Sequence, residues 1–213
     1  MKIDKVYIIH FEELSNRKQY LESEIPNRYG FSNYEFIISN RMSDEKILKN
    51  TNYYYDKSEW SSELSNAEIC NMEVQYSVWE RIAHGSEEIV LIVEDDIIFK
   101  ENYDELFPTM VESLPYDFDI CFLSDCARLT LPQQPGLYFR EAGTSRCCVS
   151  YIVKKESAKK LLDFKKYFKP VDHHLNFIKD SINLKYYWST PTIFGQGSES
   201  IYESNAGKER LPK

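Results

Sequence analysis

The chain has 213 residues, of which 26 are Lys or Arg and 34 are Asp or Glu, so its formal net charge is −8. This length suits a single α/β domain, and a hydrophobic content of 42% is enough for a folded core, which excludes wholesale disorder. Proteins that grip the nucleic-acid backbone need a cationic surface, so the acidic balance argues against that class.

Membrane-spanning and disulfide-rich proteins are also excluded at this stage. No run of about 18 apolar residues occurs, and the apolar stretch near the N-terminus is too short for a signal peptide. The cysteines are odd in number and form no Cys-x-x-Cys pair: Cys70, Cys121, Cys126, Cys147 and Cys148. We expect buried, reduced thiols in a cytoplasmic protein without a transmembrane helix, because a zinc site or disulfide scaffold would show paired spacing.

Apolar periodicity and turn residues predict strands alternating with helices. Ser15 is the expected N-cap of the first helix, which Pro26 stops. The expected strands span residues 6–9, 35–38, 89–93, 118–123, 147–153, 184–188 and 192–194. The expected helices span residues 15–24, 66–85, 103–114, 155–164 and 173–179. Residues 39–62 show no clean period and predict an irregular loop.

This alternation predicts an α/β fold with a mixed, mostly parallel central sheet and helices on both faces. We expect one domain over residues 1–194, followed by a polar C-terminal tail over residues 195–213. No internal repeat is apparent.

The most informative stretch is a run of five aliphatic residues, 89–93, that leads directly into Glu94, Asp95 and Asp96. Open α/β sheets bind ligands at the carboxyl ends of their strands, and adjacent carboxylates there repel one another. A hard divalent cation such as Mn²⁺ or Mg²⁺ would relieve that repulsion. Alternation along the strand places Glu94 and Asp96 on one side and Asp95 on the other. The alternative is a solvated strand end in which an aspartate caps a turn.

Three further segments have both a structural and a functional interpretation. Ser65 to Glu68 has the pattern of a capping box, which explains the start of the following helix without any ligand. Asp172 either caps a helix or presents a general base at a helix N-terminus. The first strand leads through Ile9 and His10 towards Arg17, a usual place for a nucleotide, although Arg17 also suits a solvated helix face. No Walker loop, glycine-rich dinucleotide fingerprint or Gly-x-Ser-x-Gly elbow occurs.

In order and spacing, these segments resemble glycosyltransferase family 25, the lipooligosaccharide-biosynthesis and collagen-galactosyltransferase type. The first strand with Arg17, the capped helix 64–79, the acidic run 92–97 and Pro170-Val171-Asp172 are similar to four family motifs in the same order. Residues 143–162 and 196–201 are similar to two more. The chain has Val74-Gln75 where the family has Ser-His, Ala67 where it has Gly, and His10-Phe11 where it has Asn-Leu.

The resemblance implies a GT-A-like fold, a UDP-sugar donor, a divalent metal and a glycan or protein hydroxyl as acceptor. By that resemblance Glu94 and Asp96 hold Mn²⁺ (or Mg²⁺), and Asp172, with Asp125 as second choice, is the catalytic base of an inverting hexose transfer, with galactose or glucose as the sugar. The residues expected at the nucleotide sugar are Ile9, His10, Arg17, Glu68, Gln75 and Asp95. Two alternatives remain open: an inactive glycosyltransferase-like binding domain, and a metal-dependent phosphohydrolase or nucleotidyltransferase.

Overall fold

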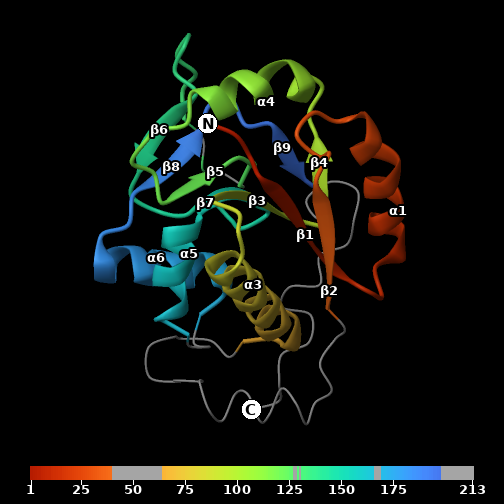
Figure 1. Ribbon diagram of the computed structural model, residues 1–213, viewed down its shortest axis with the longest axis vertical. Helices are drawn as coiled ribbons and strands as arrows, with labels where there is room; N and C mark the ends of the chain where they lie inside the picture. Colours follow the sequence, from red (N-terminus) through yellow and green to blue (C-terminus); the bar gives the residue numbers. More distant parts are fainter. Residues whose placement is uncertain (40–63, 127–128, 130, 166–168, 198–213) are drawn as a thin grey trace.

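A seven-stranded sheet forms the centre of the computed structural model, which describes residues 1–39, 64–126, 129, 131–165 and 169–197 (Figure 1). In spatial order its strands are β2 (Tyr34–Ser39), β1 (Lys5–Phe11), β3 (Ile89–Glu94), β7 (Ser150–Lys154), β5 (Ile120–Phe122), β8 (Tyr186–Ser189) and β6 (Phe139–Ala142). The predicted loop 39–62 falls almost wholly outside the described residues.

The sheet is mixed, and five of its seven strands run in one direction. β1 is parallel to β2 and β3, and β5 is parallel to β8. β7 is antiparallel to both β3 and β5, and β6 is antiparallel to β8. The strands β2, β1, β3, β5 and β8 therefore end at the same edge. This confirms the predicted α/β class with a mostly parallel sheet.

Helices cover both faces of the sheet, as predicted (Figure 1). They are α1 (Ser15–Glu24), a short 3₁₀ helix η1 (Ile25–Asn27), α3 (Asn66–His84), α4 (Tyr103–Glu112), α5 (Lys155–Leu162) and α6 (Val171–Ile182). Two separate apolar clusters show which helix packs on which face. One unites α3, α5 and α6 with the sheet through residues such as Trp79, Leu161 and Leu175. The other unites α1 and α4 with the opposite face through Leu21 and Phe107.

A small second sheet pairs β4 (Ile97–Phe99) with β9 (Phe194–Gln196) in antiparallel fashion. β4 follows the acidic residues directly, so this pairing fixes the chain just beyond the end of β3. Gly195 and Gln196, at the start of the predicted tail, lie in β9, whereas residues 198–213 lie outside the described part of the chain.

The helix starts differ from prediction in two places. The N-cap of α1 is Leu14 rather than Ser15, and the N-cap of α6 is Pro170. Neither residue makes a side-chain capping hydrogen bond. Asp172 is thus inside the first turn of α6 instead of capping it. The capping box of α3 is confirmed: Ser65 accepts from the Glu68 amide, and Glu68 accepts from the Ser65 amide.

Three strands, β4, β6 and β7, also differ from prediction, and β4 (Ile97–Phe99) was not among the expected strands. β6 was not predicted, because its sequence Phe-Arg-Glu-Ala carries no apolar run and pairs only with β8 at the sheet edge. β7 begins at Ser150 instead of residue 147, because Cys147 has a positive φ of 43° that no strand residue adopts.

The prediction of five reduced thiols is wrong for two of them. Cys126 and Cys147 form a disulfide, while Cys70, Cys121 and Cys148 are free and buried. The two bonded cysteines lie 21 residues apart in the sequence, a separation without any local motif, so only the fold brings them together. No helix in the described ranges is long and apolar enough to cross a bilayer.

Candidate active site

The acidic residues lie where β3 ends, beside the end of β1. The register pairs Ile9 of β1 with Glu94 of β3, and the Glu94 amide donates to the Val149 carbonyl at 2.8 Å. Ile9 is predicted to contact the nucleotide, but its side chain is buried in the core. Three chain segments, β1, β3 and the approach to β7, therefore meet at this edge, which the strand-end rule marks for ligand binding.

Asp95 joins three of the predicted nucleotide-binding residues into one buried cluster. Its Oδ1 accepts from Arg17 Nη1 at 2.9 Å, and its Oδ2 is 2.8 Å from His10 Nδ1 and accepts from the Phe11 amide at 3.3 Å. Asp95, His10 and Arg17 are all buried. Because both carboxylate oxygens of Asp95 bond to protein groups, this residue ties the end of β3 to β1 and α1.

Glu94 points to the opposite face of the sheet, towards α3. Its Oε1 accepts from Asn71 Nδ2 at 2.9 Å and, at a long 3.5 Å, from Gln75 Nε2. Burial raises the pKa of Glu94 to about 8, and the nearby negative charge of Asp96 adds to the rise, against the Asn71 hydrogen bond, which lowers it. The charges of Asp95 and Asp172 raise this pKa further. The Glu94 carboxyl is therefore surrounded by negatively charged side chains.

A directed chain of hydrogen bonds orients Gln75. Trp79 Nε1 donates to the Tyr151 hydroxyl at 2.8 Å, and that hydroxyl donates to Gln75 Oε1 at 2.6 Å. An indole nitrogen only donates, so the Tyr151 proton must go to Gln75 Oε1, which leaves the Gln75 amide nitrogen facing Glu94. Gln75 is fully buried, and its one contact with Glu94 is the long hydrogen bond from Nε2.

Asn71 is a site residue that sequence reasoning missed. Glu68, Asn71 and Gln75 are three and seven residues apart on α3 and therefore share one helix face, and that spacing was the available signal. Glu68 Oε2 accepts from both the Ser65 amide at 2.7 Å and the Ser65 hydroxyl at 2.9 Å. Glu68 thus holds the start of the helix that delivers Asn71 and Gln75 to Glu94.

Asp96 and Asp172 complete the acidic cluster. Asp96 is buried, and its carbonyl accepts from the Gly197 amide at 2.6 Å. Asp172 is half-buried in the first turn of α6, with Oδ1 accepting from the His173 amide at 2.9 Å. The Ser145 hydroxyl donates to the Asp172 carbonyl at 2.9 Å, which joins α6 to the chain that approaches β7. Beyond the effect of burial, the negative charge of Asp96 and, to a lesser extent, that of Asp172 raise the pKa of Glu94.

Asp125 lies apart from this cluster, just beyond β5. Its Oδ2 is 2.6 Å from Lys100 Nζ, and its Oδ1 accepts from the Thr192 hydroxyl. Burial raises the pKa of Asp125, but the hydrogen bonds from Lys100 and Thr192 outweigh it and leave the pKa below its ordinary value. Asp125 is thus held as a paired carboxylate.

Within the described residues, no group of three or more His, Cys, Asp and Glu side chains has the geometry of a metal site. Magnesium-type ions seldom need one, because they take one or two carboxylates and complete their shell with water and substrate phosphate. Glu94 and Asp96 fit this donor set: both are oxygen ligands, and the negative charge that raises the Glu94 pKa favours a cation.

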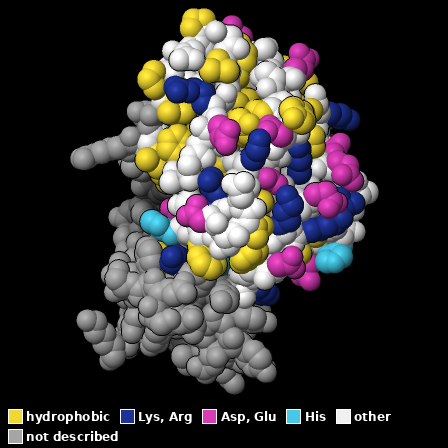
Figure 2. Space-filling view, turned by 90° about the vertical axis from the view of Figure 1, so that its left-hand side faces the viewer, with side chains coloured by type: hydrophobic (Ala, Val, Ile, Leu, Met, Phe, Trp, Pro, Cys, Tyr) yellow, Lys and Arg dark blue, Asp and Glu magenta, His cyan; other side chains and the backbone are white. Residues whose placement is uncertain are grey.

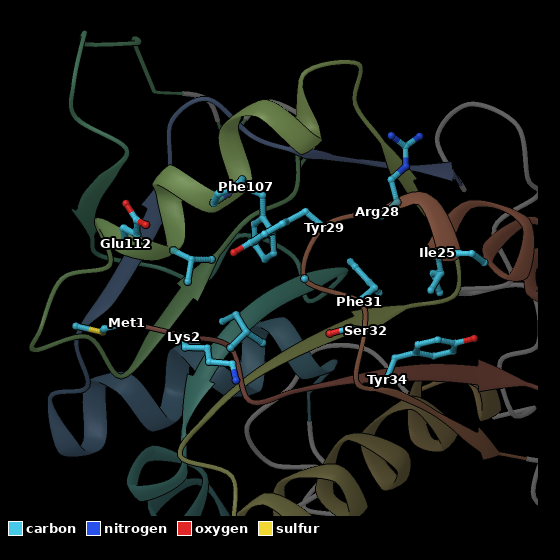
Figure 3. Close-up of a pocket in the computed structure, with 15 residues that line it drawn as sticks. Met1, Lys2, Ile25, Arg28, Tyr29, Phe31, Ser32, Tyr34, Phe107 and Glu112 are labelled. Carbon is cyan, nitrogen blue, oxygen red and sulfur yellow. The ribbon is translucent and has the colours of Figure 1, made fainter.

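One face of the surface and a pocket away from the acidic residues complete the description. On the described part of the face in Figure 2, basic and acidic side chains are interspersed, unlike the basic stripe of a nucleic-acid binder. A pocket of about 640 Å³ lies between α4 and the segments that precede β1 and β2, lined by Lys2, Tyr29, Tyr34 and Phe107 among others (Figure 3). It is at the amino ends of these strands, and none of the predicted site residues lines it.

A mixed α/β sheet with carboxylates at a strand end marks a ligand site, and the sequence decides which class of enzyme it belongs to. The sequence matches the family described as glycosyltransferase family 25 (LPS biosynthesis protein) over residues 3–175. The chain therefore belongs to glycosyltransferase family 25. No curated protein matches the sequence.

One solved structure supports the fold, and two others show a weaker likeness. A glycosyltransferase involved in glycosylation of the major capsid of PBCV-1 is 11% identical, with a TM-score of 0.53 over 92% of each chain. Staphylococcus aureus TarS (residues 1–349) has 10% identity and a TM-score of 0.46, over 93% of this chain and 61% of that one. GlyE of Streptococcus pneumoniae has 10% identity and a TM-score of 0.45, over 87% and 45%. At these identities the first likeness supports the fold alone.

Proposed function

We propose that this glycosyltransferase is metal-dependent and transfers a hexose, galactose or glucose, from a UDP-sugar to a hydroxyl of a glycan or protein acceptor with inversion. The observation that carries this proposal is the position of Glu94 and Asp96 at the end of β3, where burial and the charge of Asp96 raise the pKa of Glu94 to about 8. Such a cluster favours a cation, and a cation there would favour a diphosphate.

Glu94 and Asp96 are the proposed ligands of Mn²⁺ or Mg²⁺. Asp95 is the weaker candidate, because both of its oxygens already bond to His10, Arg17 and a backbone amide. A bound divalent ion would supply Lewis-acid stabilisation of charge on the departing nucleotide. Asn71 and Gln75 donate to one oxygen of Glu94 and so hold the carboxylate in place.

His10 and Arg17 are proposed to shape the nucleotide site from the β1 side. Asp95 holds both side chains, so their positions are set before any ligand binds. Glu68 contributes indirectly by capping α3. The role of Ile9 is proposed for its backbone, because its side chain lies in the core.

Asp172 is our first choice for the catalytic base that takes the acceptor proton. It is half-buried in the first turn of α6, its carbonyl accepts from the Ser145 hydroxyl in the segment before β7, and its charge raises the pKa of Glu94. Asp125 is second, because a carboxylate paired with Lys100 and Thr192, with a pKa below its ordinary value, is a weaker proton acceptor.

Calorimetric titration with UDP, with and without Mn²⁺, tests the metal site. We expect Mn²⁺ to strengthen UDP binding in the wild type, and Asp96→Ala to abolish that gain. Glu88→Ala is the matched control, because Glu88 is an exposed acid at the other end of β3. Equal gains in the wild type and in Asp96→Ala would refute the assignment.

Product analysis then tests the reaction. Release of free hexose from a UDP-hexose with Mn²⁺ indicates glycosyl transfer to water, whereas release of sugar phosphate indicates phosphohydrolase chemistry. We expect Asp172→Asn to reduce turnover at least a hundredfold with nearly unchanged UDP affinity. A larger loss of turnover in Asp125→Asn than in Asp172→Asn would make Asp125, and not Asp172, the catalytic base.

A cytoplasmic location is a further proposal, and the disulfide provides its test. Disulfides are rare in the reducing cytosol, so Cys126 and Cys147 should be free thiols in intact cells if the enzyme works there. Mass spectrometry after rapid alkylation of cell lysates distinguishes the two states. A retained Cys126–Cys147 bond would refute the cytoplasmic location.

A further inference from the structure

Arg146 is a buried cation that the proposed chemistry does not use. It lies in the segment between β6 and β7 and is only 3% exposed. Its Nη1 donates to the Ser189 carbonyl at 3.0 Å, and its guanidinium carbon is 5.2 Å from the centre of the Trp188 ring. Its Nε is buried and has no hydrogen-bond partner in the described part of the chain.

No carboxylate among the described residues forms an ion pair with this guanidinium. The charge of Asp125 raises the Arg146 pKa, yet burial lowers it more. Asp125 itself is engaged by Lys100 at 2.6 Å and by Thr192. A buried charge without a counter-ion is costly, so a fold that keeps one there is prepared for an anion from outside.

The location of Arg146 points to the substrate edge of the sheet. Trp188 and Ser189 end β8, and Asp125 follows β5, so the guanidinium lies at the carboxyl ends of two strands parallel to each other. Residue 149 of the same segment bonds to Glu94 through backbone atoms at 2.8 Å. Arg146 is therefore at the same edge as the acidic cluster.

This position is on the side of the cluster away from the proposed nucleotide. In the sheet order, β1 with His10 lies on one side of β3, and β5 and β8 lie on the other. Asp125, whose charge acts on Arg146, has a side chain that is 43% exposed and lines a pocket of about 760 Å³ with Lys100 and Gln196; Arg146 itself does not line that pocket. A donor held near β1 leaves this half of the edge for the acceptor.

We propose that Arg146 binds an anionic group, a phosphate or a carboxylate, on the acceptor saccharide. The planar guanidinium matches both groups with paired N–H donors, and Trp188 supports it from one face. The Ser189 carbonyl accepts from Nη1, and the buried Nε has no hydrogen-bond partner among the described residues, so it is the donor we assign to the ligand. Assigning the anion to the acceptor rests on the proposed function, whereas anion binding at Arg146 does not depend on it.

The test is a titration that needs neither donor nor metal. Glucose 6-phosphate, glucuronate and glucose are added separately to the full chain, and the side-chain Nε–Hε resonance of Arg146, assigned with Arg146→Lys, is followed by ¹H–¹⁵N NMR. We expect a saturable shift with the phosphate sugar, the carboxylate sugar or both, and none with glucose. Arg146→Lys keeps the positive charge but loses the paired N–H donors of the guanidinium, so we expect it to bind the charged sugars at least tenfold more weakly. Arg81→Gln is the control, because Arg81 is a half-exposed arginine paired with Glu35.

Three results would overturn the proposal. An unchanged Arg146 resonance with both charged sugars, or equal affinity in Arg146→Lys and wild type, would show that no anion binds there. Metal-free UDP that competes with glucose 6-phosphate, and binds more weakly to Arg146→Lys, would assign the residue to the donor instead. Loss of UDP–Mn²⁺ binding with retained sugar-phosphate binding would refute the proposed function and leave the anion site standing.

Discussion

Replacing Glu94 by Gln should remove a pH-dependent loss of stability. The pKa of Glu94 is about 8 in the folded chain and 4.5 as its ordinary value. Between these values the unfolded chain has released a proton that the folded chain still holds, so stability falls as pH rises. At about 1.4 kcal/mol per pKa unit, the loss reaches about 3 kcal/mol at pH 7 and about 5 kcal/mol above pH 8, as upper limits for a half-buried group.

The assay is urea denaturation of wild type and Glu94→Gln at intervals from pH 5 to pH 9. We expect the difference in unfolding free energy to grow in favour of Glu94→Gln across this range and to level off above pH 8. Glutamine keeps the shape and still accepts from Asn71, so the comparison isolates the charge. Glu88→Gln is the control and should follow the wild-type curve. Parallel curves for Glu94→Gln and wild type would refute the assigned burial and crowding of Glu94.

Three further predictions concern the residues that support the site. Asp95→Asn should destabilise the chain by about 3–5 kcal/mol in urea denaturation, because Arg17 loses its buried partner; a loss below about 1 kcal/mol would contradict the buried pair. Tyr151→Phe should cost about 2 kcal/mol and weaken Mn²⁺-dependent UDP binding, because Trp79 and Gln75 both lose a partner and the Gln75 amide is free to turn; unchanged UDP affinity would contradict the directed chain. Ser65→Ala should cost about 1 kcal/mol and speed hydrogen exchange at the Glu68 amide, and unchanged exchange would contradict the capping box.

Much of the fold is readable from the sequence because its signals are local. The five aliphatic residues of β3 can only be buried on both faces, and Ser65 with Glu68 fixes the start of α3 through bonds three residues apart. β6 escaped prediction because only its partner β8 makes it a strand. The Cys126–Cys147 bond also escaped, since it depends on the placement of β5 and β7.

The site is readable in its acidic residues and less so in their partners. Three consecutive carboxylates after an apolar strand can be recognised from the sequence alone. The donors that orient them come from three other elements, β1, α1 and α3. Asn71 and Gln75 are ordinary helix residues until α3 packs beside β3. Arg146 resembles a solvated cation in sequence, and only its burial beside Trp188 distinguishes it.

The three adjacent carboxylates have different surroundings: Glu94 is the last residue of β3, and Asp95 and Asp96 form the turn that leads into β4. Asp95 faces α1, where Arg17 and His10 consume both of its oxygens, so it fixes the geometry of the edge. Glu94 faces α3, where amide donors hold one oxygen and the charge of Asp96 raises its pKa. Asp95, whose charge is paired with Arg17, therefore has a structural role, whereas Glu94 and Asp96, whose charges interact, favour a cation. A substitution at Asp95 should act on folding, whereas one at Glu94 should act on pH-dependent stability and, like one at Asp96, on ligand binding, because Asp95 bonds to β1 and α1 while Glu94 faces α3.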